Sequence, residues 1–558
     1  MSLRERSSQI GTDESPVTPK HALTAKRAFS AKHAATPSQT LTPKQEAKAR
    51  ALGVTSATGL VIGSIVGTGV FTMPAVLAGA GTMSLAVLGV IAIGAMVLAV
   101  LFGQLTRRVP NADGGMYAYA RHEFGDFAGY LTGWCYWVQS WAGNAAIVSS
   151  WVFYVTALFG WANPSGLQLW AIALVGLWIP AAVNLAGVRQ MAWFQNVSVF
   201  LKFMPLLFIG IVGWFYVHGG NFGSFNMSGG SLYSGIGIAA GVALFSFIGV
   251  EAAAITAKRV KDPGRNVSRA SLLGTGASAV LYLLTAAVVM GLVPHHALVA
   301  TGSPFVTAFR NMFQAAWAAK FIAAVAVVSG IGALNGWTLL VTETSRAVAQ
   351  DGLFPRPFAW QDRKHTAWFG IVVGTVLPSI LMLWSYETKT GLTVFTYLVD
   401  LTVVTVAIPY FMSAIAQLTY LVSRRRPVQG WALARDLLVA GISVLFSMWV
   451  TFASGYQVVY QALVVLMAGL VFYALLNARR TPAPGTEPSA GIAPSMLAVT
   501  DGHGGGALGQ AGAAVEGVPA RTLRAVPDPA DGTPPAAGPG GTGTIGTPPV
   551  TGTAPAPQ

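Results

Sequence analysis

The sequence contains little cysteine and little charge. Its single cysteine, Cys135, excludes an intrachain disulfide and a cysteine-rich metal site, and its place in an apolar run predicts a small buried side chain. Charged residues make up 10% of the 558 residues, whereas 53% are hydrophobic, and the mean hydropathy is +0.57. Such a composition cannot cover a globular surface with polar groups. It indicates a membrane protein that crosses the bilayer several times.

Acidic residues are also scarce, with 20 Asp and Glu against 34 Lys and Arg. The basic residues gather in short segments between apolar runs and not on an aromatic-studded soluble face, so we expect contact with membrane lipids and none with nucleic acid. None of the eight histidines falls in the middle of an apolar run. A haem or zinc centre inside the membrane is therefore not expected, and no metal or other cofactor is predicted.

Long apolar runs dominate the rest of the chain. A hydrocarbon core of about 30 Å needs roughly 20 apolar residues per helix, and we count twelve runs of that kind. They predict an all-α membrane protein of about twelve transmembrane helices. The runs lie near 54–79, 84–106, 125–158, 167–187, 191–216, 232–256, 270–293, 315–348, 367–386, 392–420, 433–453 and 456–477.

Lys and Arg concentrate in one set of alternating loops, whereas the other set carries only Arg310 and Lys389. This asymmetry predicts a multi-pass protein of the cell membrane with both termini in the cytoplasm. Residues 1–50 are rich in Ser, Thr, Lys and Arg, and residues 481–558 in Gly, Pro, Ala and Thr. Both are predicted to be disordered cytoplasmic tails that flank a twelve-helix domain at 51–480.

Glycines interrupt the first apolar run in the segment "IGSIVGTGVF", residues 62–71. Inside a bilayer, non-helical backbone is tolerated only where it faces a cavity or another part of the protein. Gly59, Gly63 and Gly67 also form a small-xxx-small ladder, which is typical of closely packed helices. The segment alone leaves a binding pocket and helix packing equally open.

A second interruption falls in the sixth run, "ALFSFIGVEAAAITA", where Gly249 precedes the acid Glu251. Paired interruptions five spans apart indicate an inverted five-plus-five repeat with a substrate at the midplane. The repeats would cover about 54–216 and 232–420, followed by two extra helices within 433–477. Broken helix ends offer N–H groups to an anion and carbonyls to a cation, and an amino acid zwitterion carries both charges.

Five segments together resemble the amino acid-polyamine-organocation superfamily of permeases, and within it the arginine/agmatine and related basic amino acid or polyamine antiporters. They are "IGSIVGTGVFTMPAVLAGAG", "ADGGMYAYARHEFG", "WCYWVQSWAGNAAIV", "FSFIGVEAAAITAKRVKDPGRNVSRAS" and "GWTLLVTETSRAVAQDGLFP". The resemblance covers about residues 50 to 478. It implies a LeuT-like fold with broken first and sixth helices, and secondary transport by alternating access.

The resemblance also implies a substrate pocket. Trp337 and Phe245 would act as aromatic gates, and Trp337 could hold a cation by an interaction worth about 2 kcal/mol when desolvated, although packing between helices is the alternative. The related antiporters have tryptophan where Phe245 stands, which weakens the expectation of arginine selectivity. The positions that match substrate-binding residues are Ser64, Ile65, Gly67, Thr68, Gly69, Tyr136, Asn144, Phe245, Ile248, Trp337 and Thr402.

Ionisable residues within the spans need a reason, because a charge at membrane depth costs at least about 2.5–3.5 kcal/mol. Glu251, after the interruption, is a candidate proton sensor, with a structural hydrogen bond as the alternative. Lys202 either exchanges a proton or extends toward the membrane surface; some proton-coupled relatives have a lysine in this span. Asp400 could pair with a cationic substrate or with Lys202. For Glu343 and Arg346 an intrahelical ion pair is expected.

These features predict a non-enzymatic secondary transporter with a small-molecule substrate, and the family implies a possible homodimer. It would be an antiporter that exchanges a basic amino acid (arginine, ornithine or lysine) for a related amino acid or amine. The alternative is a proton-coupled symporter of neutral amino acids, which Lys202 and Phe245 favour. A non-transporting membrane sensor is a further alternative, but the tails contain no recognisable signalling domain.

Overall fold

The structure is a computed structural model. It describes residues 52–67, 69–109, 114–362, 366–389, 391–423 and 429–478, all of which fall in one compact unit, Met1–Ala483. The predicted tails, 1–50 and 481–558, and the predicted site residue Thr68 lie outside the described residues.

The described residues fold almost entirely into helices, which confirms the predicted all-α class. The β pairing among the described residues is limited to one isolated bridge between Leu52 and Val260. The α-helices are α3 (Val54–Ile65), α4 (Gly69–Ala80), α5 (Met83–Arg108), α6 (Met116–Phe124), α7 (Asp126–Phe159), α8 (Gly166–Ala186), α9 (Val188–Val212), α10 (Leu232–Phe247), α11 (Ala252–Ile255), α12 (Pro263–Leu292), α13 (His295–Ala300), α14 (Pro304–Phe313), α15 (Ala316–Gln350), α16 (Trp368–Thr388), α17 (Leu392–Val422), α18 (Gly430–Ala453) and α19 (Tyr456–Ala478). Short 3-10 helices are η1 (Gly213–Tyr216), η2 (Gly219–Asn221), η3 (Ala257–Arg259) and η4 (Arg356–Ala359).

Each of the twelve predicted spans falls on a helix or a helix pair. Within the described part of the chain, ten helices are long and apolar enough to cross a membrane, and the bent pair α3 and α4 makes eleven. The fifth predicted span coincides with α9 and η1. The apolar helix found there among the described residues is Phe200–Tyr216, which is shorter than the other candidate spans. The protein is therefore a multi-pass membrane protein. Its orientation and the inverted relation of its two halves stay predictions.

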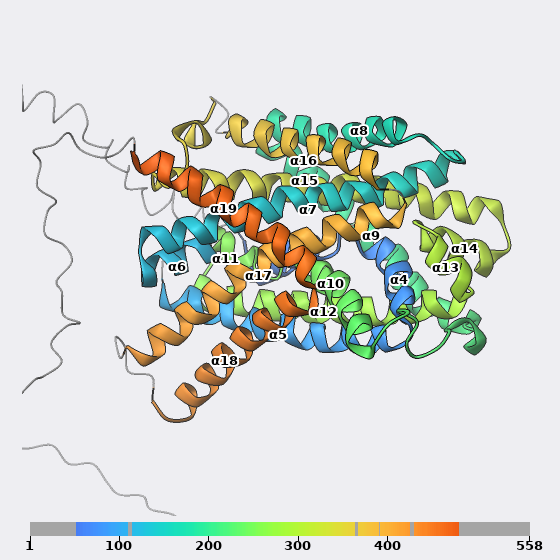
Figure 1. Ribbon diagram of the computed structural model, residues 1–558, viewed down its shortest axis with the longest axis horizontal. Helices are drawn as coiled ribbons and strands as arrows, with labels where there is room; N and C mark the ends of the chain where they lie inside the picture. Colours follow the sequence, from blue (N-terminus) through green and yellow to red (C-terminus); the bar gives the residue numbers. More distant parts are fainter. Residues whose placement is uncertain are drawn as a thin grey trace, which may run out of the picture. The chain divides into compact units, whose positions relative to one another are not determined.

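The helices pack in two groups around the centre of the unit (Figure 1). In one group α7, α8, α15 and α16 contact one another, and in the other α12 packs against α3 and α5 while α10 packs against α4 and α5. Helix α17 packs against α7 and also against α18. Cys135 on α7 is fully buried, as predicted.

Two helices end at glycine-containing segments where the groups meet. Helix α3 ends at Ile65, and α4 resumes at Gly69 with its axis bent by 49°. Helix α10 ends at Phe247, and Gly249 adopts a φ of +117°, a conformation that side chains rarely allow. A Cβ on Gly249 would lie 2.8 Å from the carbonyl carbon of Ser64. The two segments are therefore in direct backbone contact.

Candidate functional site

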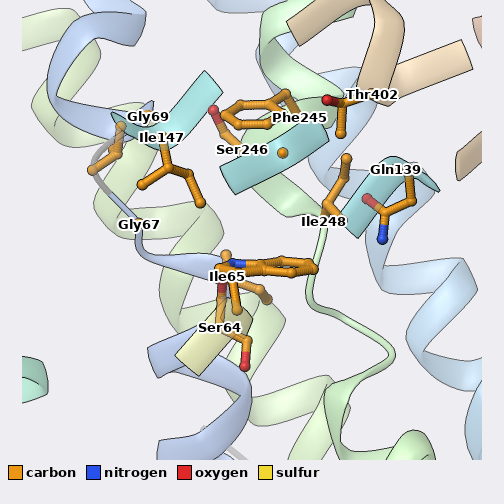
Figure 2. A pocket seen from close by; sticks show the side chains of 13 residues that line it. Ser64, Ile65, Gly67, Gly69, Gln139, Ile147, Phe245, Ser246, Ile248 and Thr402 are labelled. Carbon is orange, nitrogen blue, oxygen red and sulfur yellow. Dashed lines mark hydrogen bonds between the residues drawn. The ribbon is translucent and has the colours of Figure 1, made fainter. Parts of the chain in front are cut away.

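A pocket lies where the two helix groups meet, beside the segment between α3 and α4 (Figure 2). Its walls come from α3 and α4, from α7, from the end of α10, and from α15 and α17. The site therefore draws on segments that are up to about 340 residues apart in the sequence, as the separation of Ser64 and Thr402 shows. The lining residues are Ser64, Ile65, Gly67, Gly69, Val70, Gln139, Gly143, Ile147, Phe245, Ser246, Ile248, Trp337 and Thr402.

Most of the predicted substrate residues meet in this pocket. Tyr136 and Asn144 are buried on α7 but do not line it, and Tyr136 contacts Glu251 instead. Those that line the pocket are Ser64, Ile65, Gly67, Gly69, Phe245, Ile248, Trp337 and Thr402. The substrate-binding role of these residues stays a prediction.

Sequence reasoning missed one face of α7. Gln139, Gly143 and Ile147 line the pocket at intervals of four residues, the spacing of one helix face. The Gln139 side chain is fully buried; its amide nitrogen donates to Ser140 Oγ at 2.8 Å, while Oε1 has no partner among the described residues. It therefore presents a free acceptor at the wall of the pocket. These residues follow the predicted site residue Tyr136 on the same face of α7, and this helical spacing could have identified them from the sequence.

The last turn of α3 leaves carbonyl groups that no following turn of the same helix can pair, although Gly67 N donates to Ile65 O at 2.8 Å. Three consecutive carbonyls each accept a hydrogen bond from a different helix: α9, α15 and α12. The negative end of the helix dipole favours a cation at this place, and one of the three donors is the side-chain amine of Lys202. The pairs are Lys202 Nζ to Gly63 O at 2.6 Å, Trp337 Nε1 to Ser64 O at 3.2 Å, and Tyr282 Oη to Ile65 O at 2.8 Å.

The first turn of α4 supplies the opposite polarity. Gly69 and Val70 line the pocket at the helix start, where the first N–H groups lack partners within the helix and the dipole is positive. The Phe245 ring lies against this turn, because a Cβ on Gly69 would be 2.6 Å from Phe245 Cε1. The pocket therefore places anion-binding backbone, cation-binding backbone and an aromatic ring around one small space.

Glu251 lies outside the pocket and ties the second interrupted segment to two helices. Its side chain is fully buried. Oε1 accepts from Tyr136 Oη at 2.9 Å, and Oε2 accepts from Tyr410 Oη at 2.9 Å and from Gly249 N at 3.1 Å. Three donors on one carboxyl group satisfy a buried acid. These hydrogen bonds fit either role, and whether Glu251 senses protons stays a prediction.

The other ionisable groups lie apart from Glu251. Lys202 is fully buried and contacts the carbonyl of Gly63, so it does not extend to the membrane surface. Asp400 is half-buried on α17 with Oδ1 close to the α10 backbone, and no ion pair joins it to Lys202 in the part of the chain described. Glu343 and Arg346 form the expected intrahelical pair at 2.5 Å.

Comparison with known proteins finds one matching family and several similar transporters. The sequence pattern of the family described as amino acid permease matches residues 52–475. The chain is 30% identical over 433 residues to the putrescine transporter PotE of Haemophilus influenzae, covering 77% of this chain and 98% of that protein. It is 30% identical over 438 residues to PotE of Escherichia coli K12, covering 78% and 98%. It is 28% identical over 378 residues to the cadaverine/lysine antiporter of Escherichia coli K12, covering 66% and 83%.

Proposed function

The chain belongs to the amino acid permease family, and from that membership we propose that it is an antiporter of the cell membrane. It exchanges a basic amino acid, such as lysine, ornithine or arginine, for a related amino acid or amine. The names of the similar transporters, which specify putrescine, cadaverine and lysine, support a cargo with an aliphatic ammonium group. It is a transporter and not an enzyme.

One observation carries the proposal: two opposed helix ends and an aromatic ring meet at one pocket. The Ser64 carbonyl at the end of α3 accepts one hydrogen bond, from Trp337, and its second lone pair suits an α-ammonium group. The N–H groups at the start of α4 suit a carboxylate. A second ammonium group at the far end of the cargo would meet the Phe245 and Trp337 rings and the free Gln139 acceptor. A diamine would use the cation-binding part alone.

Alternating access requires the two helix groups to move relative to each other around this pocket. Because Ser64 and Gly249 are in backbone contact, α3 and α10 would move together. Phe245 and Trp337, which stand on opposite groups, are proposed as the gates. Glu251, Lys202 and Asp400 are the proposed protonatable groups, and Glu251 links the second interrupted segment to α7 and α17.

A proton-coupled symporter of neutral amino acids is the second candidate. The Lys202 ammonium at the Gly63 carbonyl, 2.6 Å away, favours it, since a buried amine at that position can act as an exchangeable cation. Phe245, a smaller ring than the expected tryptophan, also favours a less specific pocket.

Proteoliposomes separate the two candidates. Vesicles are loaded with lysine, ornithine, putrescine, cadaverine or buffer alone, and uptake of labelled lysine, ornithine, arginine and alanine is followed with and without a pH gradient. Exchange predicts uptake of a labelled basic amino acid only into vesicles that hold a basic amino acid or diamine. Uptake into buffer-filled vesicles that depends on the pH gradient alone would overturn the antiport proposal in favour of symport.

A further inference from the structure

A turn of two glycines lies between the two helix groups, away from the substrate pocket. Gly114 and Gly115 directly precede α6, and both are buried. Their φ angles are +81° and +62°, a conformation that favours glycine. The carbonyl of Gly115 accepts from the first turn of α6, from Ala118 N at 3.0 Å and from Tyr119 N at 3.2 Å. The turn therefore fixes the start of α6.

The two glycines contact helices of opposite groups. A Cβ on Gly114 would lie 3.2 Å from Cβ of Ala347 on α15. A Cβ on Gly115 would lie 3.2 Å from Cα and 3.3 Å from N of Ile255 on α11, and α11 packs against α3 and α12. Ile255 is 5% exposed and Ala347 is 4% exposed. The turn therefore fills the space between α11 and α15, and a side chain on Gly115 would press on the α11 backbone.

The contact between Gly115 and Ile255, here called the seam, joins the same two groups as the pocket does. On α15, Ala347 is ten residues after the pocket residue Trp337, or about 15 Å along the helix at 1.5 Å per residue. In the other group, Ile255 follows the pocket residue Ile248 across the second interrupted segment. The pocket and the seam are therefore successive contacts between the groups, and the seam lies toward the end of the molecule where α15 ends.

Helix α6 is fixed more firmly to one group than to the other. On the side of α15, Arg121 forms an ion pair with Asp351 at 2.6 Å, and the hydroxyl of Tyr117 contacts the same carboxylate. Tyr117 also belongs to the apolar cluster that α7 and α15 share. On the side of α5, a neutral hydrogen bond of 2.9 Å joins Tyr119 Oη and Thr106 Oγ1. Helix α6 therefore belongs with α7 and α15, and it meets the other group at the seam and at Thr106.

We propose that the turn of Gly114 and Gly115 is a further gate of the transport path, at the predicted cytoplasmic end. In this structure the turn closes the space between α11 and α15. Opening toward this end breaks the hydrogen bond between Thr106 and Tyr119 and separates Gly115 from Ile255, while α6 stays with α7 and α15. The inference rests on the proposed transport by alternating access, but not on which cargo is carried.

Thiol labelling from each face of the membrane tests the gate. Cys135→Ser removes the single native thiol, and Ile248→Cys places a reporter at the pocket wall. A membrane-impermeant methanethiosulfonate is added to right-side-out or inside-out vesicles that contain the full-length protein. Gly115→Ala presses on the α11 backbone and should raise the labelling rate about tenfold, from the predicted cytoplasmic face only. Tyr119→Phe, which removes the neutral hydrogen bond, should raise it about fivefold from the same face.

Gly125→Ala is the matched control. Gly125, at the other end of α6, also has a positive φ, +85°, but nothing lies within 4 Å of its Cβ position, so this variant should leave the labelling rate unchanged. If Gly115→Ala does not fold, Tyr119→Phe still tests the gate. Labelling of both variants at the rate of the control, or faster labelling from both faces alike, would overturn the proposal. The expected labelling in a protein that exchanges no basic amino acid would support the gate and overturn the proposed cargo.

Discussion

Gly69 is the pocket glycine at which an added Cβ would lie closest to its neighbours. A Cβ at this position would lie 2.6 Å from Phe245 Cε1, whereas nothing lies within 4 Å of a Cβ on Gly59. Both Gly69 and Phe245 line the pocket. A methyl group on Gly69 therefore has to displace the ring that closes one side of the pocket.

We predict that Gly69→Ala raises the half-saturating substrate concentration about tenfold, because overpacking costs roughly 1–3 kcal/mol and the displaced ring occupies substrate space. Exchange kinetics in proteoliposomes measure the effect. Gly59→Ala is the matched control and should behave as the unaltered protein. Equal kinetics for the two variants would show that Phe245 moves at no cost and that Gly69 serves helix packing only.

Variants of Glu251 can distinguish a role in hydrogen bonding from a role in proton exchange. Glu251→Gln keeps one carbonyl acceptor, and the hydroxyls of Tyr136 and Tyr410 can reorient to accept from the new amide. We predict that this variant folds and exchanges substrate with a pH dependence that is flattened, since the amide does not titrate. Thermal unfolding and exchange rates from acid to neutral pH provide the measurement.

Glu251→Ala is the contrasting variant, because it leaves two buried hydroxyls and one N–H without an acceptor, at about 1–3 kcal/mol for each group. It should lower the melting temperature clearly. Glu343→Gln, in a partly exposed ion pair, controls for loss of a carboxylate elsewhere. An unchanged pH profile in Glu251→Gln would remove Glu251 from the residues proposed for proton coupling.

At the scale of elements, the interrupted segments depend on Gly249. A residue other than glycine would be strained at its φ of +117°. A Cβ at this position would also lie 2.8 Å from the Ser64 carbonyl carbon and 3.0 Å from Ile65 N. These are backbone atoms, which cannot rotate away. The close contact of α3 with the end of α10 therefore requires glycine at this position.

We predict that Gly249→Ala lowers the free energy of unfolding by about 2–3 kcal/mol, since left-handed strain of roughly 1–2 kcal/mol adds to the backbone clash. Gly229→Ala provides the control, because Gly229 also has a positive φ, +70°, but nothing lies within 4 Å of its Cβ position. In detergent, Gly249→Ala should have a lower melting temperature than Gly229→Ala. Equal losses would mean that the backbone contact is easily relaxed.

The helices themselves were largely predictable, because the length of an apolar run fixes a membrane span. The twelve ranges match the structure with edge differences of a few residues, except that α12 begins at Pro263, seven residues before the predicted start. Helices α6, α13 and α14 were not predicted, since they are too short to span a bilayer and do not form long apolar runs.

The candidate site was predictable in part. Glycines in apolar runs pointed to the backbone of α3 and α4, because they are costly there without a purpose. The inward face of α7 was not predicted, since that helix is buried on most sides and its hydrophobic pattern marks no single face. The partners of Lys202 and Tyr282 join residues 139 and 217 positions apart. Such contacts arise from packing and leave no local signal.

Across the whole molecule, one buried carboxylate joins α18 to α5 and, through Gln104, to α17. Asp436 on α18 is 4% exposed and accepts from two residues of α5 and from its neighbour Arg435. Gln104 Nε2 donates to Oδ1 at 2.8 Å, and the Arg108 guanidinium contacts Oδ2 at 2.5 Å. Gln104 in turn accepts from Gln417 of α17 at 2.7 Å. The network connects α5, α17 and α18.

We predict that Asp436→Asn destabilises the protein by about 3–5 kcal/mol, because it leaves the Arg108 charge, on a side chain only 10% exposed, without its main counter-ion. Asp126→Asn is the matched control: its ion pair with Arg121 is exposed by 60% and 32%, so its loss should cost at most about 1 kcal/mol. Thermal unfolding in detergent compares the two. If Asp436→Asn unfolds no earlier than Asp126→Asn, α18 is held by apolar packing alone, and the network contributes no net stability.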